Sequence, residues 1–152
     1  MLNSRATNLA NFAQKMKEKL IKIFGDILRV DDEIYYAFPT PQKLASADIE
    51  KLRKCGLSFR KARCIRDVSK MILNKNLDLD KREKYEDTGK IIAELSKISG
   101  IGVWTAEMTM VRGLHKFEVV PADDIGLQRN VSNYYSKGRK ITSQAVQRIA
   151  GK

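Results

Sequence analysis

Two adjacent aspartates, Asp123 and Asp124, are the side chains whose type and setting best suit chemistry. They follow Pro121 and precede an apolar-periodic stretch that starts at Ile125, which is the pattern of a helix N-terminus. One of the pair is therefore expected to be an ordinary N-cap. A carboxylate in this position is also kept ionised by the helix dipole and by backbone N–H donors. Such an anion can stabilise positive charge that develops on a sugar and can orient an attacking water, as glycosidic bond cleavage requires.

A second candidate site is the segment Gly100-Ile101-Gly102, which joins two predicted amphipathic helices. Glycines on both sides of an aliphatic residue let the backbone turn tightly, and Ile101 is expected to point inward and hold the turn rigid. The following helix then begins with backbone N–H groups that lack intrahelical partners, at the positive end of its dipole. Several such donors can bind one phosphate. The alternative is a turn that binds no ligand.

Helices must position these two segments, because helical periodicity extends over nearly the whole chain. The first helix is expected to end near Gly25, and a short one is expected to start at Thr40-Pro41. Residues 74–87 are predicted to form a connecting loop, and residues 117–120 could be extended but have no partner strand. The sequence therefore predicts an all-α helical bundle. Its other expected helices span residues 48–55, 59–73, 88–98, 103–112, 124–134 and 142–149.

The charge balance indicates the kind of partner. The chain of 152 residues carries 29 Lys and Arg against 18 Asp and Glu, a formal net charge of +11. This excess favours a polyanion, and nucleic acid is the commonest one, although anionic lipid would give the same balance. The two cysteines, Cys55 and Cys64, match no zinc or redox motif. No apolar run approaches the roughly 20 residues that span a bilayer, so we expect an intracellular protein with no membrane partner.

Three motifs together resemble a known family. Residues 100–108 read Gly-Ile-Gly-Val-Trp-Thr-Ala-Glu-Met, residues 121–127 read Pro-Ala-Asp-Asp-Ile-Gly-Leu, and residues 35–41 read Tyr-Tyr-Ala-Phe-Pro-Thr-Pro. This combination resembles the helix-hairpin-helix/Gly-Pro-Asp superfamily of base excision repair glycosylases, and within it the 3-methyladenine DNA glycosylase II branch. The resemblance implies an all-α fold with a helix-hairpin-helix motif. It also implies an enzyme that hydrolyses the N-glycosidic bond of damaged, alkylated bases in duplex DNA.

The resemblance implies roles for three side chains. Asp124 corresponds to the catalytic aspartate of the family, and Asp123 to its structural neighbour. Trp104 occupies the position at which bifunctional relatives carry a lysine, whose amine attacks the sugar and leads to strand cleavage. An indole cannot form that Schiff base, so we expect a monofunctional enzyme that leaves an abasic site. Trp104 then has two interpretations: it lines the base pocket and stacks on a cationic alkylated purine, or it belongs to the hydrophobic core.

The resemblance also implies a contact with DNA. In the family the hairpin grips backbone phosphates and carries no sequence readout, so duplex DNA containing damaged bases is the expected partner. Its turn carbonyls often hold a monovalent cation as well, which makes the Ile98–Gly102 turn a candidate cation site; no cofactor is expected. The residues assigned to DNA contact are Lys97, Ser99, Gly100, Ile101, Gly102 and Thr105.

The sequence departs from the family in its extent. Relatives carry further chain before the position of Ser4 and closing aromatic helices after the catalytic aspartate. We therefore expect residues 1–152 to form a single helix-hairpin-helix DNA glycosylase domain that is incomplete at both termini. Such a chain is a minimal form, a fragment, or half of a split enzyme that a second polypeptide completes. The main alternative is a non-catalytic helix-hairpin-helix DNA-binding module, such as a truncated relic of the enzyme.

Overall fold

The computed structural model describes residues 3–78 and 87–151, with side chains from residue 11 onward. Residues 79–86, which belong to the expected connecting loop, lie outside the described part. The chain forms two compact units, Met1–Asp78 and Leu79–Lys152, and each has a hydrophobic cluster of its own. In the part of the chain that is described, no helix is long and apolar enough to cross a membrane.

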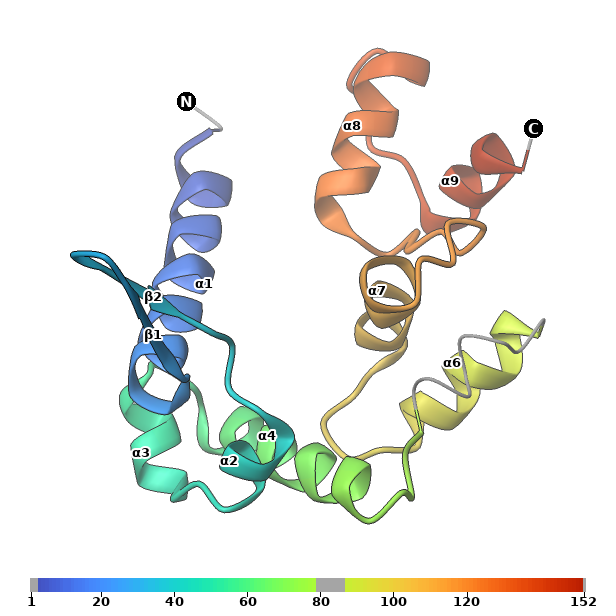
Figure 1. The fold of residues 1–152 in the computed structure, drawn as a ribbon. Coiled ribbons are helices and arrows are strands. Elements are labelled where there is room, and N and C mark those ends of the chain that lie inside the picture. Colours follow the sequence, from blue (N-terminus) through green and yellow to red (C-terminus); the bar gives the residue numbers. More distant parts are fainter. Residues whose placement is uncertain (1–2, 79–86, 152) are drawn as a thin grey trace. The chain divides into compact units, whose positions relative to one another are not determined.

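Short capping sequences determine where the helices of the first unit begin. The side chains of Thr40, Asp48 and Ser58 each accept a hydrogen bond from the backbone N–H three residues ahead. The helices bury one face each in a shared cluster that includes Leu20, Leu44, Leu52, Cys55 and Ala62. The helices are α1 (Asn3–Phe24), α2 (Pro41–Ala45), α3 (Ile49–Lys54) and α4 (Phe59–Leu73), as Figure 1 shows.

A two-stranded antiparallel hairpin lies between α1 and α2. Strand β1 (Ile27–Val30) pairs with β2 (Glu33–Tyr36), with Ile27 opposite Tyr36 and Val30 opposite Glu33. Asp31 and Asp32 form the two-residue connection, and Asp31 takes a positive φ of 52°. Aspartate tolerates this conformation better than most residues. The hairpin is not among the elements expected from the sequence.

Gly25 allows the chain to leave α1 and enter the hairpin. A Cβ at this position would lie 2.2 Å from the Ala37 carbonyl oxygen and 2.4 Å from that of Ile21. Both contacts are with backbone, which cannot easily move aside. Glycine is therefore required where the residue that follows β2 passes close to the end of α1.

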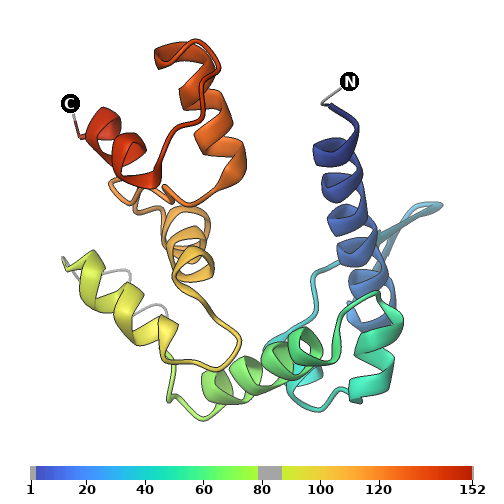
Figure 2. The same ribbon diagram turned by 180° about the vertical axis from the view of Figure 1, so that it is seen from behind.

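The second unit contains the two segments singled out in the sequence. Its described helices are α6 (Thr88–Ser96), α7 (Val103–Gly113), α8 (Ile125–Tyr135) and α9 (Ser143–Ala150). Helices α6 and α7 pack against each other and are joined by residues 97–102, whose path can be followed in both views (Figures 1 and 2). Helices α8 and α9 enclose a small cluster built on Ala122, Ile141 and Val146.

The observed elements confirm the expected, mostly helical fold class. Helix α4 has the expected bounds, and α1, α7 and α8 end within one residue of the expected positions. Phe117 and Glu118 form a turn, closed by a hydrogen bond from the Val119 N–H to the Lys116 carbonyl, and residues 117–120 are not a strand. The hairpin is therefore the only β-structure within the described ranges, and it lies outside the unit that carries the candidate site.

Candidate active site and nucleic-acid interface

Asp124 is the N-cap of α8. Its backbone is extended, with φ −67° and ψ 119°, and its Oδ1 accepts the Leu127 N–H at 2.7 Å. The ordinary N-cap interpretation therefore applies to Asp124 itself, the residue to which the sequence also assigned chemistry. The two roles are compatible, because each carboxylate oxygen has a second lone pair. The side chain is half-buried, which fixes it without removing it from solvent.

The second oxygen of this carboxylate is held by a tryptophan. Trp104 Nε1–H donates to Asp124 Oδ2 at 3.2 Å, across 20 residues of sequence. Trp104 lies in the first turn of α7, two residues after Gly102, so the bond places Asp124 beside the start of the helix that follows the glycine turn. The tryptophan side chain is 46% exposed and is therefore not a core residue. Sequence reasoning did not foresee this hydrogen bond.

Asp123 has a different set of contacts. Its Oδ1 accepts the hydroxyl proton of Ser143, the first residue of α9. Gln128 reinforces the same junction, since its Nε2 donates to the Ala122 carbonyl at 2.8 Å and to Ser143 Oγ at 3.1 Å. Asp123 thus ties α9 to the segment in front of α8, while Asp124 faces α7.

A third carboxyl group, that of Glu107, lies close enough to Asp123 for an electrostatic interaction between the two. Its Oε2 is buried and has no hydrogen-bond partner in the part of the chain that is described. Burial raises the pKa of the Glu107 carboxyl above its ordinary value of 4.5, and the negative charge of Asp123 raises it further. Sequence reasoning missed Glu107, because nothing in its spacing on α7 distinguishes it from a solvated helix residue.

The glycine turn has the geometry expected of a tight helix-to-helix connection. Gly100 adopts a φ of +95°, a region that side-chain-bearing residues rarely occupy, and the Ile101 N–H donates to the Ile98 carbonyl at 3.0 Å. Ile101 is half-buried, in line with the inward position expected for it. The turn delivers Gly102 as the N-cap of α7, with φ −91° and ψ 172°.

The N-terminus of α7 differs from those of the other described helices. Seven N-caps are described, and six of them use a Thr, Ser or Asp side chain to accept a backbone N–H from the first turn. The N-cap of α7 is Gly102, which offers no side-chain acceptor. A Cβ at Gly102 would meet nothing within 4 Å. The first N–H groups of α7 therefore lack a side-chain acceptor at the cap, and an anion can accept them.

The residues that the sequence assigned to DNA contact are brought together by this one turn. Lys97 is the C-cap of α6, and Thr105 lies in the first turn of α7 with its carbonyl accepting the Thr109 hydroxyl at 2.8 Å. Apart from Ile101, all of them are solvent-exposed, as are the flanking residues Val103 and Trp104. The arrangement is an exposed, uncapped helix end beside a lysine, and its chemistry suits a phosphate group.

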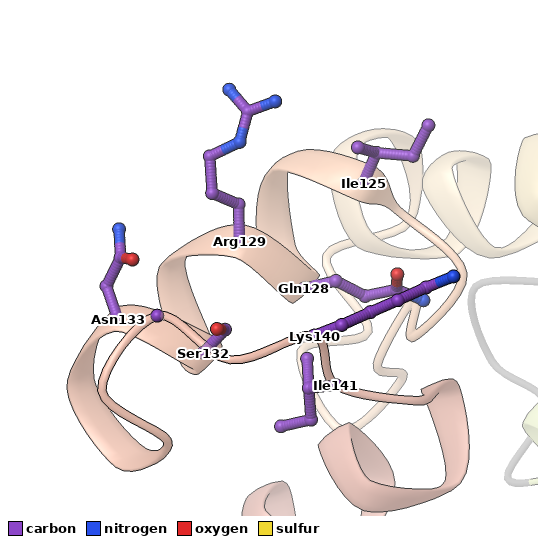
Figure 3. A pocket seen from close by; sticks show the side chains of 8 residues that line it. Ile125, Gln128, Arg129, Ser132, Asn133, Lys140 and Ile141 are labelled. Atoms are coloured by element: carbon purple, nitrogen blue, oxygen red, sulfur yellow. The ribbon is translucent and has the colours of Figure 1, made fainter. Parts of the chain in front are cut away.

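A pocket of about 370 Å³ lies on α8 and on the segment that leads to α9. Figure 3 shows Arg129 and Lys140 among its lining side chains, together with Gln128, Ser132 and Asn133. Asp124 is not among the residues that line it, although the next residue, Ile125, is. The pocket therefore does not coincide with the carboxylate–indole pair, and we place the candidate active site at that pair and not in this pocket.

Gly126 is a further residue of the site that sequence reasoning recorded only as part of a motif. A Cβ at this position would lie 3.0 Å from Asp124 Oδ1, which is closer than ordinary van der Waals contact. The absence of a side chain at Gly126 therefore leaves room for the capping carboxylate. The signal in the sequence was the glycine immediately inside a helix, where alanine is more favourable.

Comparisons with known proteins identify the family of the chain. The family model of the HhH-GPD superfamily base excision DNA repair protein matches residues 1–152. The alkylbase DNA glycosidase-like protein of Schizosaccharomyces pombe is 30% identical over 112 residues, which are 74% of this chain and 53% of that protein. The S. pombe DNA-3-methyladenine glycosylase 1 is 31% identical over 107 residues, 70% of this chain and 46% of that protein. The chain thus spans about half the length of these relatives.

A solved structure gives the same result for the fold. The 3-methyladenine DNA glycosylase from Archaeoglobus fulgidus superposes with a TM-score of 0.82 at 32% sequence identity, and the match covers 99% of this chain and 48% of that one.

Proposed function

The chain belongs to the HhH-GPD superfamily of base excision DNA repair proteins, and we propose that it is a monofunctional DNA glycosylase that removes alkylated bases from duplex DNA. The observation that carries this proposal is the position of Asp124. Its carboxylate caps α8 and contacts Trp104, which lies two residues beyond an uncapped glycine turn. A carboxylate and a helix end without a side-chain cap thus adjoin each other in one compact unit.

The proposed role of Asp124 follows from the chemistry of the bond that breaks. As the base departs, the sugar develops positive, oxocarbenium-like charge, and a nearby carboxylate stabilises it. The same carboxylate can orient the attacking water. Asp124 has lone pairs left for this, because the two contacts with Leu127 and Trp104 use one on each oxygen.

The proposed DNA contact is made by the glycine turn. A backbone phosphate would accept the first N–H groups of α7, with Lys97 adding positive charge at the end of α6. The net charge of +11 supports a polyanionic partner of this kind. Backbone carbonyls are also ligands that suit a monovalent cation, so residues Ile98–Gly102 would hold one if it binds, and it would draw the phosphate closer.

Trp104 supports the monofunctional assignment and the preference for alkylated bases. An indole has no amine with which to form a Schiff base on the sugar, so the product is an abasic site. The exposed ring also offers a π-face to a flipped base, and an electron-rich indole favours a cationic alkylated purine.

We also propose that a second polypeptide binds residues 1–152 and that the two together form one complete domain. The proposed location of this assembly is inside the cell. Strands β1 and β2 expose apolar side chains on both of their faces, among them Ile27, Leu28, Ile34 and Tyr35. A hairpin with two exposed apolar faces is marginal by itself and gains stability when another element covers it. A relic that binds DNA without catalysis is the competing function.

The experiment that tests the proposal is base release from alkylated duplex DNA that contains 3-methyladenine or 7-methylguanine. Wild-type protein should release the base and leave an abasic site. Asp124→Asn should lower the rate by at least about a hundredfold while DNA affinity stays the same. Asparagine is the suitable replacement because it caps a helix as well as aspartate does and so preserves the start of α8. DNA binding by folded wild-type protein without any base release would favour the non-catalytic module.

A further inference from the structure

The strongest unassigned relationship in the molecule is the bond between the indole of Trp104 and the carboxylate of Asp124. The indole N–H lies in the plane of the ring, so its donation to Asp124 Oδ2 puts the carboxylate at the edge of the ring, where it covers neither ring face. With 46% of its surface exposed, Trp104 still offers a face to a base. Stacking and hydrogen bonding by this side chain therefore do not compete.

Three features of the second unit restrict the Asp124 carboxylate to one orientation. The Leu127 N–H fixes Oδ1 from within α8, at 2.7 Å. The Trp104 N–H fixes Oδ2 from α7, at 3.2 Å. The missing side chain at Gly126 leaves the space in which Oδ1 lies, 3.0 Å from where a Cβ would be. Removing either hydrogen bond would let the carboxylate rotate, and adding a side chain at Gly126 would crowd it. Either change would alter the direction of the carboxylate, which matters for the reaction.

We propose that Trp104 is a positioning residue, whose indole N–H orients the Asp124 carboxylate beside the base that stacks on the same ring. This inference rests on the proposed glycosylase activity and adds to it a coupling between base recognition and catalysis. A base that stacks on the ring face with its glycosidic bond toward the Nε1 edge would bring that bond close to the carboxylate. Gly126 serves the same purpose by leaving the carboxylate room.

The first experiment separates positioning from stacking. Trp104→Phe keeps an aromatic face and removes the N–H, whereas Trp104→Ala removes both. A hydrogen bond to a charged group corresponds to about tenfold in rate, so kcat of Trp104→Phe should fall by about that factor with KM unchanged. Trp104→Ala should lower kcat and also raise KM. If Trp104→Phe keeps the wild-type kcat while Trp104→Ala does not, the ring only stacks, and the proposal is overturned.

The second experiment needs no activity and so distinguishes a failure of this inference from a failure of the proposed function. Trp104 is the single tryptophan of the chain, so its indole N–H gives one resonance in a ¹⁵N-correlated NMR spectrum. Asp124→Ser keeps the N-cap but shortens the side chain, and it should move that resonance and speed its exchange with water. Asp87→Ser, at the N-cap of α6, is the matched control and should leave the resonance in place. An unmoved resonance in Asp124→Ser would refute the hydrogen bond.

A third variant tests the space at Gly126. Gly126→Ala should crowd Asp124 Oδ1 and lower kcat several-fold, although alanine raises helix stability relative to glycine. Gly113→Ala in α7 is the control, because its Cβ would meet only Thr109 Cγ2 at an ordinary 3.7 Å. Loss of activity without loss of stability is the outcome expected of Gly126→Ala alone. Equal kcat in the two variants would contradict the role given to Gly126.

Discussion

The hydroxyl of Ser143, at the start of α9, donates to Oδ1 of Asp123. The two adjacent aspartates therefore have different partners, because Asp124 accepts a hydrogen bond from Trp104 on α7 instead. Two neighbouring carboxylates are thereby held by two different helices. The pair thus links α7, α8 and α9 of the second unit at one point of the chain.

Ser143→Ala should therefore weaken the fold of the second unit and spare its chemistry. Losing the hydrogen bond to Asp123 and the one accepted from Gln128 is expected to lower the free energy of unfolding by at least about 1 kcal/mol, which corresponds to at least about 3 °C in Tm. Base release per folded molecule should stay near the wild-type rate. Calorimetry measures the change in Tm, and a single-turnover assay measures the rate of base release. A large loss of rate at unchanged Tm would mean that Asp123 takes part in the reaction.

Gly102→Glu should weaken the binding of duplex DNA. A carboxylate at this N-cap would occupy the exposed N–H groups of α7 and repel a phosphate. If one phosphate contact is lost, the slope of log K against log salt should become shallower by about 0.9. Titrations of DNA binding at several salt concentrations measure both quantities.

Gly102→Ala is the control for that variant. Its Cβ would enter open space, and the N–H donors remain. DNA affinity should stay close to that of the wild type. If Gly102→Glu also binds DNA as the wild type does, at every salt concentration, the turn has only a structural role.

The wild-type protein should form no covalent complex with DNA under borohydride. Trapping requires a Schiff base between an amine and the opened sugar, and we propose that Trp104 replaces the lysine that forms it in bifunctional relatives. The measurement is a denaturing gel of protein incubated with alkylated DNA and borohydride, with a lysine-bearing bifunctional glycosylase as the positive control. A trapped adduct on this chain would overturn the monofunctional assignment.

Much of the helical fold could be predicted because capping residues near the helix ends indicate where the helices begin. Asp48, Ser58 and Thr142 are side-chain caps followed by apolar periodicity, and each helix begins directly after its cap. The hairpin could not be recognised in the same way. Its strands expose apolar side chains on both faces, so the polar-apolar alternation of a half-buried strand is absent. The signal available was the Asp31-Asp32 pair between two runs rich in β-formers.

The candidate site was predictable in its parts and not in its connections. Motif resemblance selected Asp124, Trp104 and the glycine turn, whose backbone geometry follows from the glycines themselves. The bond between Trp104 and Asp124 joins residues 20 positions apart, and it depends on how α7 packs beside the segment before α8. Glu107 was missed for the same reason, because tertiary packing alone buries its Oε2.

Glu107→Gln should stabilise the protein at neutral pH. The folded-state pKa of Glu107 is raised by burial and by the charge of Asp123, so the folded protein binds this proton more tightly than the unfolded chain does. The stability from this group is therefore complete below pH 4.5 and is lost as pH rises through the folded pKa. Above that pH the ionised carboxylate is buried at a cost, which a neutral glutamine avoids; a gain of about 1 kcal/mol is expected. Urea unfolding of both proteins between pH 4 and pH 8 measures the difference in stability, and this difference should grow with pH.

Glu118→Gln, at an exposed position, is the control and should show no such growth. A gain that is the same at every pH would mean that Glu107 is not the group that titrates.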